Sequence, residues 1–259
     1  MITTKTSVAD GVATLTLNRP GEMNSLDGDT ARAIRDAVEA FGADDTVRVL
    51  VIGGEGRVFS AGGDFNWVLT WPELDAITRH AGADALMGAV QAVYDFPKPS
   101  IARVHSSAVG GGVGLMLACD FAVAASTARF GLTSVRNGLL AGIAIPVLIE
   151  AVGPRMARQL LMHGGTFDSA TALRIGLVDQ VVDAGALDAT VATLARELRL
   201  GAPSVQMLAK KLVTQINALP HDSGAAEILG EHVANQSVTP DAQEGMSAFL
   251  AKRKPKWAV

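Results

Sequence analysis

The sequence predicts an α/β protein in which most strands of the sheet are parallel. The run Val47–Ile52 is apolar in the manner of a strand that is covered on both faces. Apolar residues at helical spacing precede it over Asp29–Phe41. Further along the chain, glycine-rich turns connect strands to helices, first at residues 60–64 and again at residues 110–112. This alternation of strand, turn and helix is typical of a parallel sheet covered by helices.

Composition narrows the class of protein. The chain has 259 residues, of which 49% are hydrophobic and 19% charged, so it can bury a core without a disulfide or metal. Its single cysteine, Cys119, excludes an intrachain disulfide framework and a multi-cysteine metal site. A net charge of −4 argues against a nucleic-acid partner. No secretory signal is visible, and the long apolar stretch 138–152 is too short to span a membrane. We therefore expect a cytoplasmic protein with neither a membrane nor a nucleic-acid partner.

The first half of the chain carries the clearest strand signals. Asp10-Gly11 joins two β-rich runs and suits a tight hairpin turn. Pro97 and Pro99 end a helical segment, and a strand is expected to follow them. The elements expected here are strands Thr3–Val8 and Val12–Asn18, helix Asp29–Phe41, strand Val47–Ile52, helices Ile77–His80 and Asp84–Val93, strand Ser100–Val109, helix Val113–Cys119 and strand Phe121–Ala125.

The second half is predominantly helical. Helices are expected at Arg155–Met162, Ser169–Gly176, Leu187–Leu200, Ser204–Leu219 and Ala225–Lys252, with one strand at Leu177–Val182. A boundary near Gly201-Ala202-Pro203 divides a core of residues 1–200 from a helical region of residues 201–259. Because that region has little sheet to pack on, it should cover a neighbouring subunit or fold back on the core, and we expect association to at least a trimer.

The two glycine turns are the features most suggestive of chemistry. Glycines allow a backbone to approach a ligand closely, and a helix that begins there leaves its first N–H groups unpaired. Two such N–H groups directed at one point would stabilise an oxyanion. Both segments are equally explained as close-packing turns. Neither is a nucleotide motif, because Leu115 stands where a dinucleotide fingerprint requires glycine and no P-loop lysine follows.

The motifs together resemble the crotonase, or enoyl-CoA hydratase/isomerase, superfamily. The resemblance rests on Leu17-Asn18-Arg19-Pro20 with Asn24-Ser25-Leu26, Phe59-Ser60-Ala61-Gly62-Gly63-Asp64, Gly110-Gly111-Gly112 with Cys119-Asp120, Phe167-Asp168-Ser169-Ala170, Gly176-Leu177-Val178, and Glu244-Gly245-Met246-Ser247-Ala248-Phe249 with Lys252-Arg253. It implies a spiral of ββα turns with a C-terminal helical region, an acyl-CoA substrate, and a homotrimer or a dimer of trimers. Coenzyme A would enter as part of the substrate, with no other cofactor and no metal.

Specific positions follow from this resemblance. It implies that the N–H groups of Gly63 and Gly111 stabilise a thioester enolate. It implies that Asn24, Ala61 and Gly62 line the CoA groove. It also implies that Lys252 reaches a CoA phosphate, which in some members of the family belongs to a neighbouring subunit; a solvated tail lysine is the alternative for Lys252.

Other residues near the glycine turns have structural alternatives. Asp64 and Trp67 follow the first turn and are further candidates for contact with substrate. The alternative for Asp64 is a carboxylate at the start of the next helix, and for Trp67, with Trp71, a place in the core. His105 is expected to be packed within its strand, and Asp120 to anchor hydrogen bonds. The five histidines show no metal-ligand spacing.

The sequence departs from the family at the two glutamates that activate water in hydratases. Gly114 and Ser134 occupy those positions here. The surrounding residues, Val135-Arg136 and Gly138-Leu139, still resemble the methylglutaconyl- and isohexenylglutaconyl-CoA hydratase branch. Since one positioned acid or base contributes about 10²–10⁴-fold, we expect weak hydration with enolate stabilisation retained.

Three functions remain open. The first is a hydratase-like lyase or isomerase of fatty acid metabolism, or a related enolate enzyme such as a dehalogenase or thioester hydrolase. The second is a non-catalytic acyl-CoA-binding relative. The third, a serine peptidase on a related spiral fold, is disfavoured because no Gly-x-Ser-x-Gly elbow is present.

Overall fold

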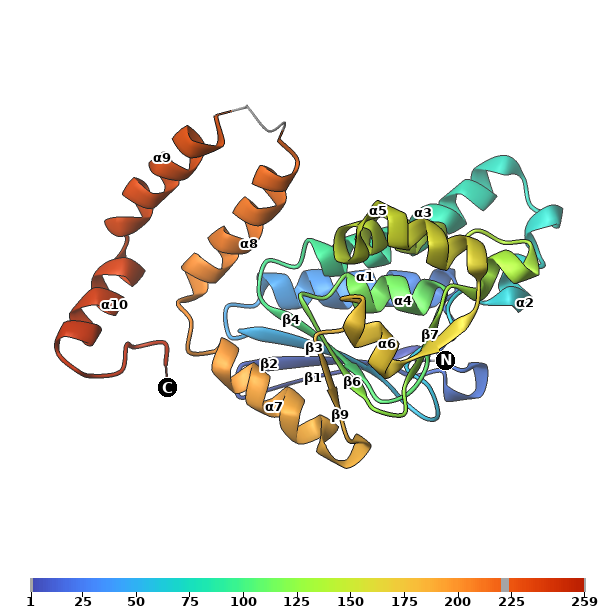
Figure 1. The fold of residues 1–259 in the computed structure, drawn as a ribbon, viewed down its shortest axis with the longest axis horizontal. Coiled ribbons are helices and arrows are strands. Elements are labelled where there is room, and N and C mark those ends of the chain that lie inside the picture. The colour runs from blue at the N-terminus through green and yellow to red at the C-terminus, as the bar shows by residue number, and fades with distance from the viewer. Residues whose placement is uncertain (1, 220–223, 259) are drawn as a thin grey trace.

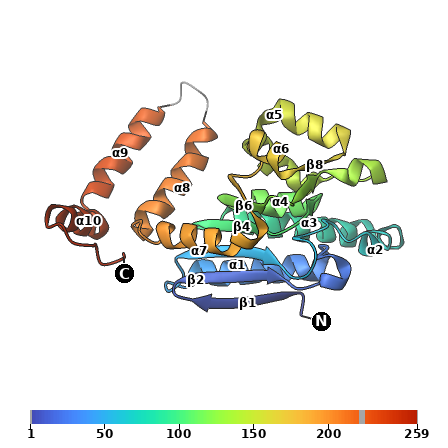
Figure 2. The ribbon, with the colours of Figure 1, turned by 60° about the horizontal axis from the view of Figure 1, so that its bottom comes forward.

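The computed structural model describes residues 2–219 and 224–258. Its main sheet has the strand order β1-β2-β3-β4-β6-β9. β1 and β2 form an antiparallel pair at one edge (Figure 2), and every later pair is parallel. The predicted α/β class is confirmed. The strands are β1 (Thr4–Ala9), β2 (Val12–Leu17), β3 (Val49–Gly54), β4 (Ser100–Val104), β6 (Phe121–Ala125) and β9 (Gln180–Val182).

The first hairpin forms as the sequence predicts. Ala9 pairs with Val12, so the loop consists of Asp10 and Gly11. Both adopt positive φ angles, 48° and 72°. A two-residue turn of this type twists in the same sense as its strands, which is why aspartate and glycine are favoured there.

Helices cover both faces of the main sheet. α1 (Gly28–Ala43), α3 (Ala76–Tyr94) and α4 (Gly111–Leu117) share one core cluster with Leu50 and Ile52. α7 (Leu187–Leu198) packs on the opposite face, where Val49 and Val51 meet Leu187 and Val191. Alternate residues of β3 therefore serve two separate cores, which explains its uninterrupted apolar sequence.

A second, smaller sheet has three strands. It contains β5 (Ala108–Val109), β7 (Arg129–Gly131) and β8 (Thr166–Asp168) in the order β5-β7-β8. The expectation of one strand over Ser100–Val109 is wrong, because β4 pairs with β3 and β6 whereas β5 pairs with β7. His105 consequently lies in the turn between two strands and not within one; its Nε2 is 3.0 Å from the Gly56 carbonyl oxygen.

The remaining helices of the core differ from the sequence expectation in continuity. α3 is one helix across Gly82, where two shorter helices were expected. α5 (Ile145–His163) starts earlier than predicted and is broken at Gly153, whose φ of 74° is non-helical. The other short segments are α2 (Phe65–Val68), α6 (Ser169–Arg174) and single turns of 3-10 helix at Pro20–Glu22, Trp71–Glu73, Thr133–Asn137, Gly142–Ala144 and Ala184–Ala186.

The C-terminal region stands beside the core. α8 (Pro203–Asn217), α9 (Ala225–Ser237) and α10 (Pro240–Leu250) project from one end of the molecule (Figure 1). The expected single helix over Ala225–Lys252 is wrong: it ends before Pro240, which starts α10 behind a Thr239 cap. Large apolar side chains on these helices are exposed, among them Val213, Val233, Phe249 and Leu250. Within the described residues, no helix has both the length and the apolarity needed to cross a membrane.

Candidate active site

The first glycine segment, residues 60–64, pairs with backbone on both sides, at Ala108 and at Leu26. Ser60 forms a parallel bridge with Ala108, and Gly63 forms one with Leu26. The Leu26 bridge uses the Gly62 carbonyl oxygen and the Asp64 N–H, at 2.7 and 2.9 Å. In a parallel ladder the intervening residue directs its own N–H to the other side. The Gly63 N–H therefore faces away from Leu26.

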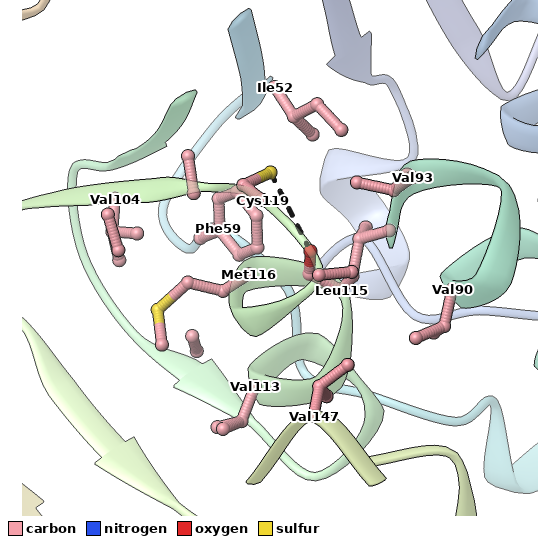
Figure 3. Close-up of a cluster of buried hydrophobic side chains, with 14 of the residues drawn as sticks. Ile52, Phe59, Val90, Val93, Val104, Val113, Leu115, Met116, Cys119 and Val147 are labelled. Atoms are coloured by element: carbon pink, nitrogen blue, oxygen red, sulfur yellow. Dashed lines mark hydrogen bonds between the residues drawn. The ribbon is translucent and has the colours of Figure 1, made fainter. Parts of the chain in front are cut away.

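The second glycine segment starts helix α4. Gly110 precedes the helix with φ 53° and ψ −119°, a conformation that L side chains rarely adopt. The predicted start of this helix at Val113 is thus two residues late, because α4 begins at Gly111. The helix is fixed by its apolar face, where Leu115 and Met116 are fully buried (Figure 3). The position of the Gly111 N–H is therefore set by the hydrophobic core.

The structure brings the two glycine segments into contact. A Cβ added to Gly62 would lie 2.9 Å from the Gly111 nitrogen, and one added to Gly111 would lie 3.6 Å from the Gly63 nitrogen. Within residues 2–219 and 224–258, neither the Gly63 nor the Gly111 N–H donates a hydrogen bond to a protein acceptor. Two adjacent, unpaired backbone donors are the arrangement that can stabilise a developing oxyanion.

The side chains nearest to Gly110, Gly111 and Gly114 are uncharged. The Ser134 Oγ lies 3.3 Å from the position of a Cβ on Gly110, and the Ile143 Cδ1 lies 2.7 Å from that of a Cβ on Gly111. Gly114, one helical turn along α4, faces the main chain of Ala144, whose Cα would be 3.1 Å from an added Cβ. The structure thus places Ser134 beside the donors and closes the space in front of Gly114.

Asp64 belongs to a buried polar network. Its Oδ1 accepts the Trp67 N–H at the start of α2, and its Oδ2 accepts from Arg19 at 2.9 Å and from the Ser25 hydroxyl at 3.0 Å. Burial raises the pKa of this carboxyl, but these donors together outweigh burial and hold it below its ordinary value. Asp64 is therefore an ionised cap that fixes the chain directly after Gly63.

The Asn24 side chain is also committed to the protein. Its amide donates to the carbonyls of Glu55 and Val58, and its Oδ1 accepts the Arg19 N–H. Asn24 is 1% exposed. The Ala61 N–H donates to the Met23 carbonyl, so the loop that carries Asn24 is tied to the first glycine segment.

The tryptophans pack against glycines of two helices. Trp67 and Trp71 meet edge to face with ring centroids 5.2 Å apart. Trp67 also lies against Gly28 of α1 and Gly82 of α3, where an added Cβ would be 3.2 and 3.1 Å away. Lys252, by contrast, is exposed in the turn after α10, at the opposite end of the molecule from α2 (Figure 1).

Two neighbours of the site were not found by sequence reasoning. Ile143 and Ala144 lie in an apolar stretch that carried no polar or glycine-turn signal pointing to a site.

Asp120, the expected anchor, accepts from the Ser100 N–H and hydroxyl and from Lys210, all at the far end of α4. A cavity of about 470 Å³ opens there between α4, α5 and α8 and is lined by neither Gly63 nor Gly111.

Comparison with known proteins decides the family. The family model described as enoyl-CoA hydratase/isomerase matches residues 7–259. The chain belongs to the enoyl-CoA hydratase/isomerase family. A crotonyl-CoA hydratase from Syntrophomonas wolfei is 36% identical over 246 residues, which are 94% of this chain and 93% of that protein.

Solved structures of the enoyl-CoA hydratase/isomerase family agree in fold. An enoyl-CoA hydratase from Shewanella pealeana superposes with a TM-score of 0.94 at 29% identity, covering 98% of this chain and 96% of the other. One from Mycobacterium smegmatis gives a TM-score of 0.92 at 29% identity and covers 100% of both chains. The crotonase fold with a C-terminal helical region, expected from the sequence, is confirmed.

Proposed function

We propose that this enoyl-CoA hydratase/isomerase family protein binds an acyl-CoA thioester and stabilises its enolate through the N–H groups of Gly63 and Gly111. The observation that carries the proposal is the approach of the two glycine segments, with both N–H groups unpaired within the described residues. Each such donor contributes about 10²–10³-fold to turnover. Ala61, Gly62 and Trp67 line the CoA side of this site, and Asn24 and Asp64 position it through their hydrogen bonds within the protein. No cofactor beyond the substrate's CoA is required.

The reaction that we propose is not efficient hydration. Hydration needs an acid and a base held at the reacting carbons, and Gly114 and Ser134 stand at the two positions inferred for them. We propose, as a hypothesis, that the chain belongs to the methylglutaconyl-CoA hydratase-like branch, which would make the acyl group of its substrate a branched one.

A second candidate is a non-catalytic acyl-CoA-binding protein. The observation that favours it is the main chain of Ala144 packed against Gly114, which crowds any side chain at that position. It predicts acyl-CoA binding without turnover of any thioester.

The experiment is a panel of acyl-CoA thioesters scored for binding by native mass spectrometry and for turnover by chromatography. A matched pair of variants isolates one donor. Ile143→Ala gives room at Gly111, and in that background Gly111→Ala keeps the N–H whereas Gly111→Pro removes it. Proline is tolerated at the first position of a helix. Turnover should fall about 10²–10³-fold between the pair; equal turnover would exclude the Gly111 N–H from the reaction.

We further propose that the chain acts as a cytoplasmic homotrimer or dimer of trimers. The exposed apolar side chains of α8, α9 and α10 support burial against another subunit. In such an assembly Lys252 would serve the site of a neighbour, since α10, which ends two residues before it, lies at the opposite end of the molecule from α2 (Figure 1). We also propose that residues 1–200 form the acyl-CoA-binding core and that residues 201–259 form the region through which subunits associate.

A further inference from the structure

The nearest side chains that lie within 4 Å of a Cβ placed on Gly110, Gly111 or Gly114 include no base. The side-chain atoms nearest to Gly110, Gly111 and Gly114 belong to Ser134, Ile143 and Ala144, none of which is ionisable near neutral pH. The carboxylate adjacent in sequence, Asp64, accepts hydrogen bonds on both oxygens and pairs with Arg19. Despite burial, these donors and the Arg19 charge hold its pKa below the ordinary value, so it is a weak base for a carbon-bound proton.

Most ways of reaching a thioester enolate require such a base. Double-bond isomerisation begins by removing a proton from carbon, and hydration or thioester hydrolysis begins by activating water. Loss of carbon dioxide is different, because the bond that breaks already supplies the electron pair. A 2-carboxyacyl thioester needs only stabilisation of the negative charge as it moves from the carboxylate to the thioester oxygen.

We propose that the substrate class is 2-carboxyacyl-CoA, of the malonyl type, and that the reaction is decarboxylation. This inference rests on the proposed function of the same site. The bond between Cα and the carboxylate carbon breaks, its electron pair forms the enolate, and CO₂ leaves. The enolate oxygen accepts hydrogen bonds from the Gly63 and Gly111 N–H groups. Water then protonates Cα, and the hydroxide formed combines with CO₂ to give bicarbonate.

The surroundings of the donors favour this direction of charge movement. Ile143 and Ala144 present apolar atoms to the site, and Ala144 is buried. An apolar wall solvates a carboxylate poorly, whereas the enolate oxygen keeps two N–H partners. The site therefore destabilises the negative charge on the carboxylate of the reactant and stabilises the negative charge on the enolate oxygen of the intermediate.

The test incubates the purified protein with malonyl-CoA and methylmalonyl-CoA in D₂O and follows acyl-CoA products by mass spectrometry. We expect release of CO₂ with one deuterium incorporated at Cα. In the Ile143→Ala background, Gly111→Pro should decarboxylate about 10²–10³-fold more slowly than Gly111→Ala.

Butyryl-CoA in D₂O serves as the control for a hidden base. Without a base its α-protons should not exchange above the rate in buffer, and exchange that matches the rate of decarboxylation would overturn the inference. Failure to decarboxylate either thioester while butyryl-CoA binds would also overturn it and leave the proposed acyl-CoA function standing. Failure of all three to bind would instead reject the proposed function itself.

Discussion

Gly114 lies against the backbone of Ala144, so that a Cβ added to Gly114 would sit 3.1 Å from the Ala144 Cα and 3.3 Å from its nitrogen. Main-chain atoms cannot rotate away as the end of a side chain can. The contact packs the turn Gly142–Ala144 on helix α4, so a side chain at residue 114 requires the turn to shift by a few tenths of an ångström.

We predict that Gly114→Ala destabilises the protein by up to about 2 kcal/mol. Overpacking costs about 1–3 kcal/mol, and the gain in helix propensity of about 1 kcal/mol offsets part of it. Gly230→Ala is the matched control, since Gly230 is also helical but has nothing within 4 Å of an added Cβ. Gly230→Ala should raise the free energy of unfolding or leave it unchanged. Urea unfolding of both variants measures the difference, and equal shifts would show that the Ala144 contact is soft.

The second prediction concerns hydration of crotonyl-CoA. The wild-type protein should be slower by about 10⁴-fold or more than a site with both acid–base groups. Ser134→Glu with Gly114→Glu should raise hydration only if the turn carrying Ala144 moves. Turnover of crotonyl-CoA and of a branched enoyl-CoA by both proteins measures this. Fast hydration by the wild type would mean that another residue supplies the base.

Asp64 should control acid stability. Because its folded pKa lies below the value of 3.8 taken for the free carboxyl, its contribution is present above pH 3.8 and is lost as the pH falls through the folded pKa. Asp64→Asn should cost about 2–4 kcal/mol at pH 6, since Arg19, whose side chain is 14% exposed, loses its most buried partner. The variant should also lose part of its acid dependence below pH 3.8.

Urea midpoints at pH 6 and pH 3 measure this effect. Asp29→Asn is the control, because Asp29 is 81% exposed and pairs with Arg32 on the surface. It should leave both midpoints nearly unchanged. A variant at residue 64 that behaves like this control would show that the Arg19 pair contributes nothing.

Cys119 should be unreactive in the folded protein. Burial, with the charge of Asp120, raises the pKa of its thiol far above the ordinary value. A thiol reagent at pH 8 should modify Cys119 only at the rate of unfolding. The raised pKa also implies stability that is fully present below about pH 9 and lost as the pH rises further. Rapid labelling in the absence of denaturant would contradict this burial.

Association should depend on the exposed apolar residues of the C-terminal helices. Phe249 is 83% exposed on α10, and Phe249→Glu should shift the protein from trimer or larger towards monomer at micromolar concentration. Met162→Glu is the matched control, because Met162 is 70% exposed on α5, outside the C-terminal helices. Sedimentation velocity measures both. A wild-type monomer would contradict the proposed assembly.

The sequence by itself determined the α/β class, the Asp10-Gly11 hairpin and the two glycine segments. Each depends on local chemistry: periodicity, positive φ angles, or the absence of a Cβ. The sequence also shows directly that residues 114 and 134 are not carboxylates, because they are glycine and serine.

Only the tertiary structure decided how these parts meet. No local signal divides Ser100–Val109 between two sheets, since that depends on which distant strands offer hydrogen bonds. Nor could the sequence place Ala144 on Gly114, because residues thirty positions apart are brought together by packing of the whole core. The approach of Gly62 to Gly111 belongs to the same class: glycine permits close contact, but the surrounding sheet and helices decide which backbone fills the space.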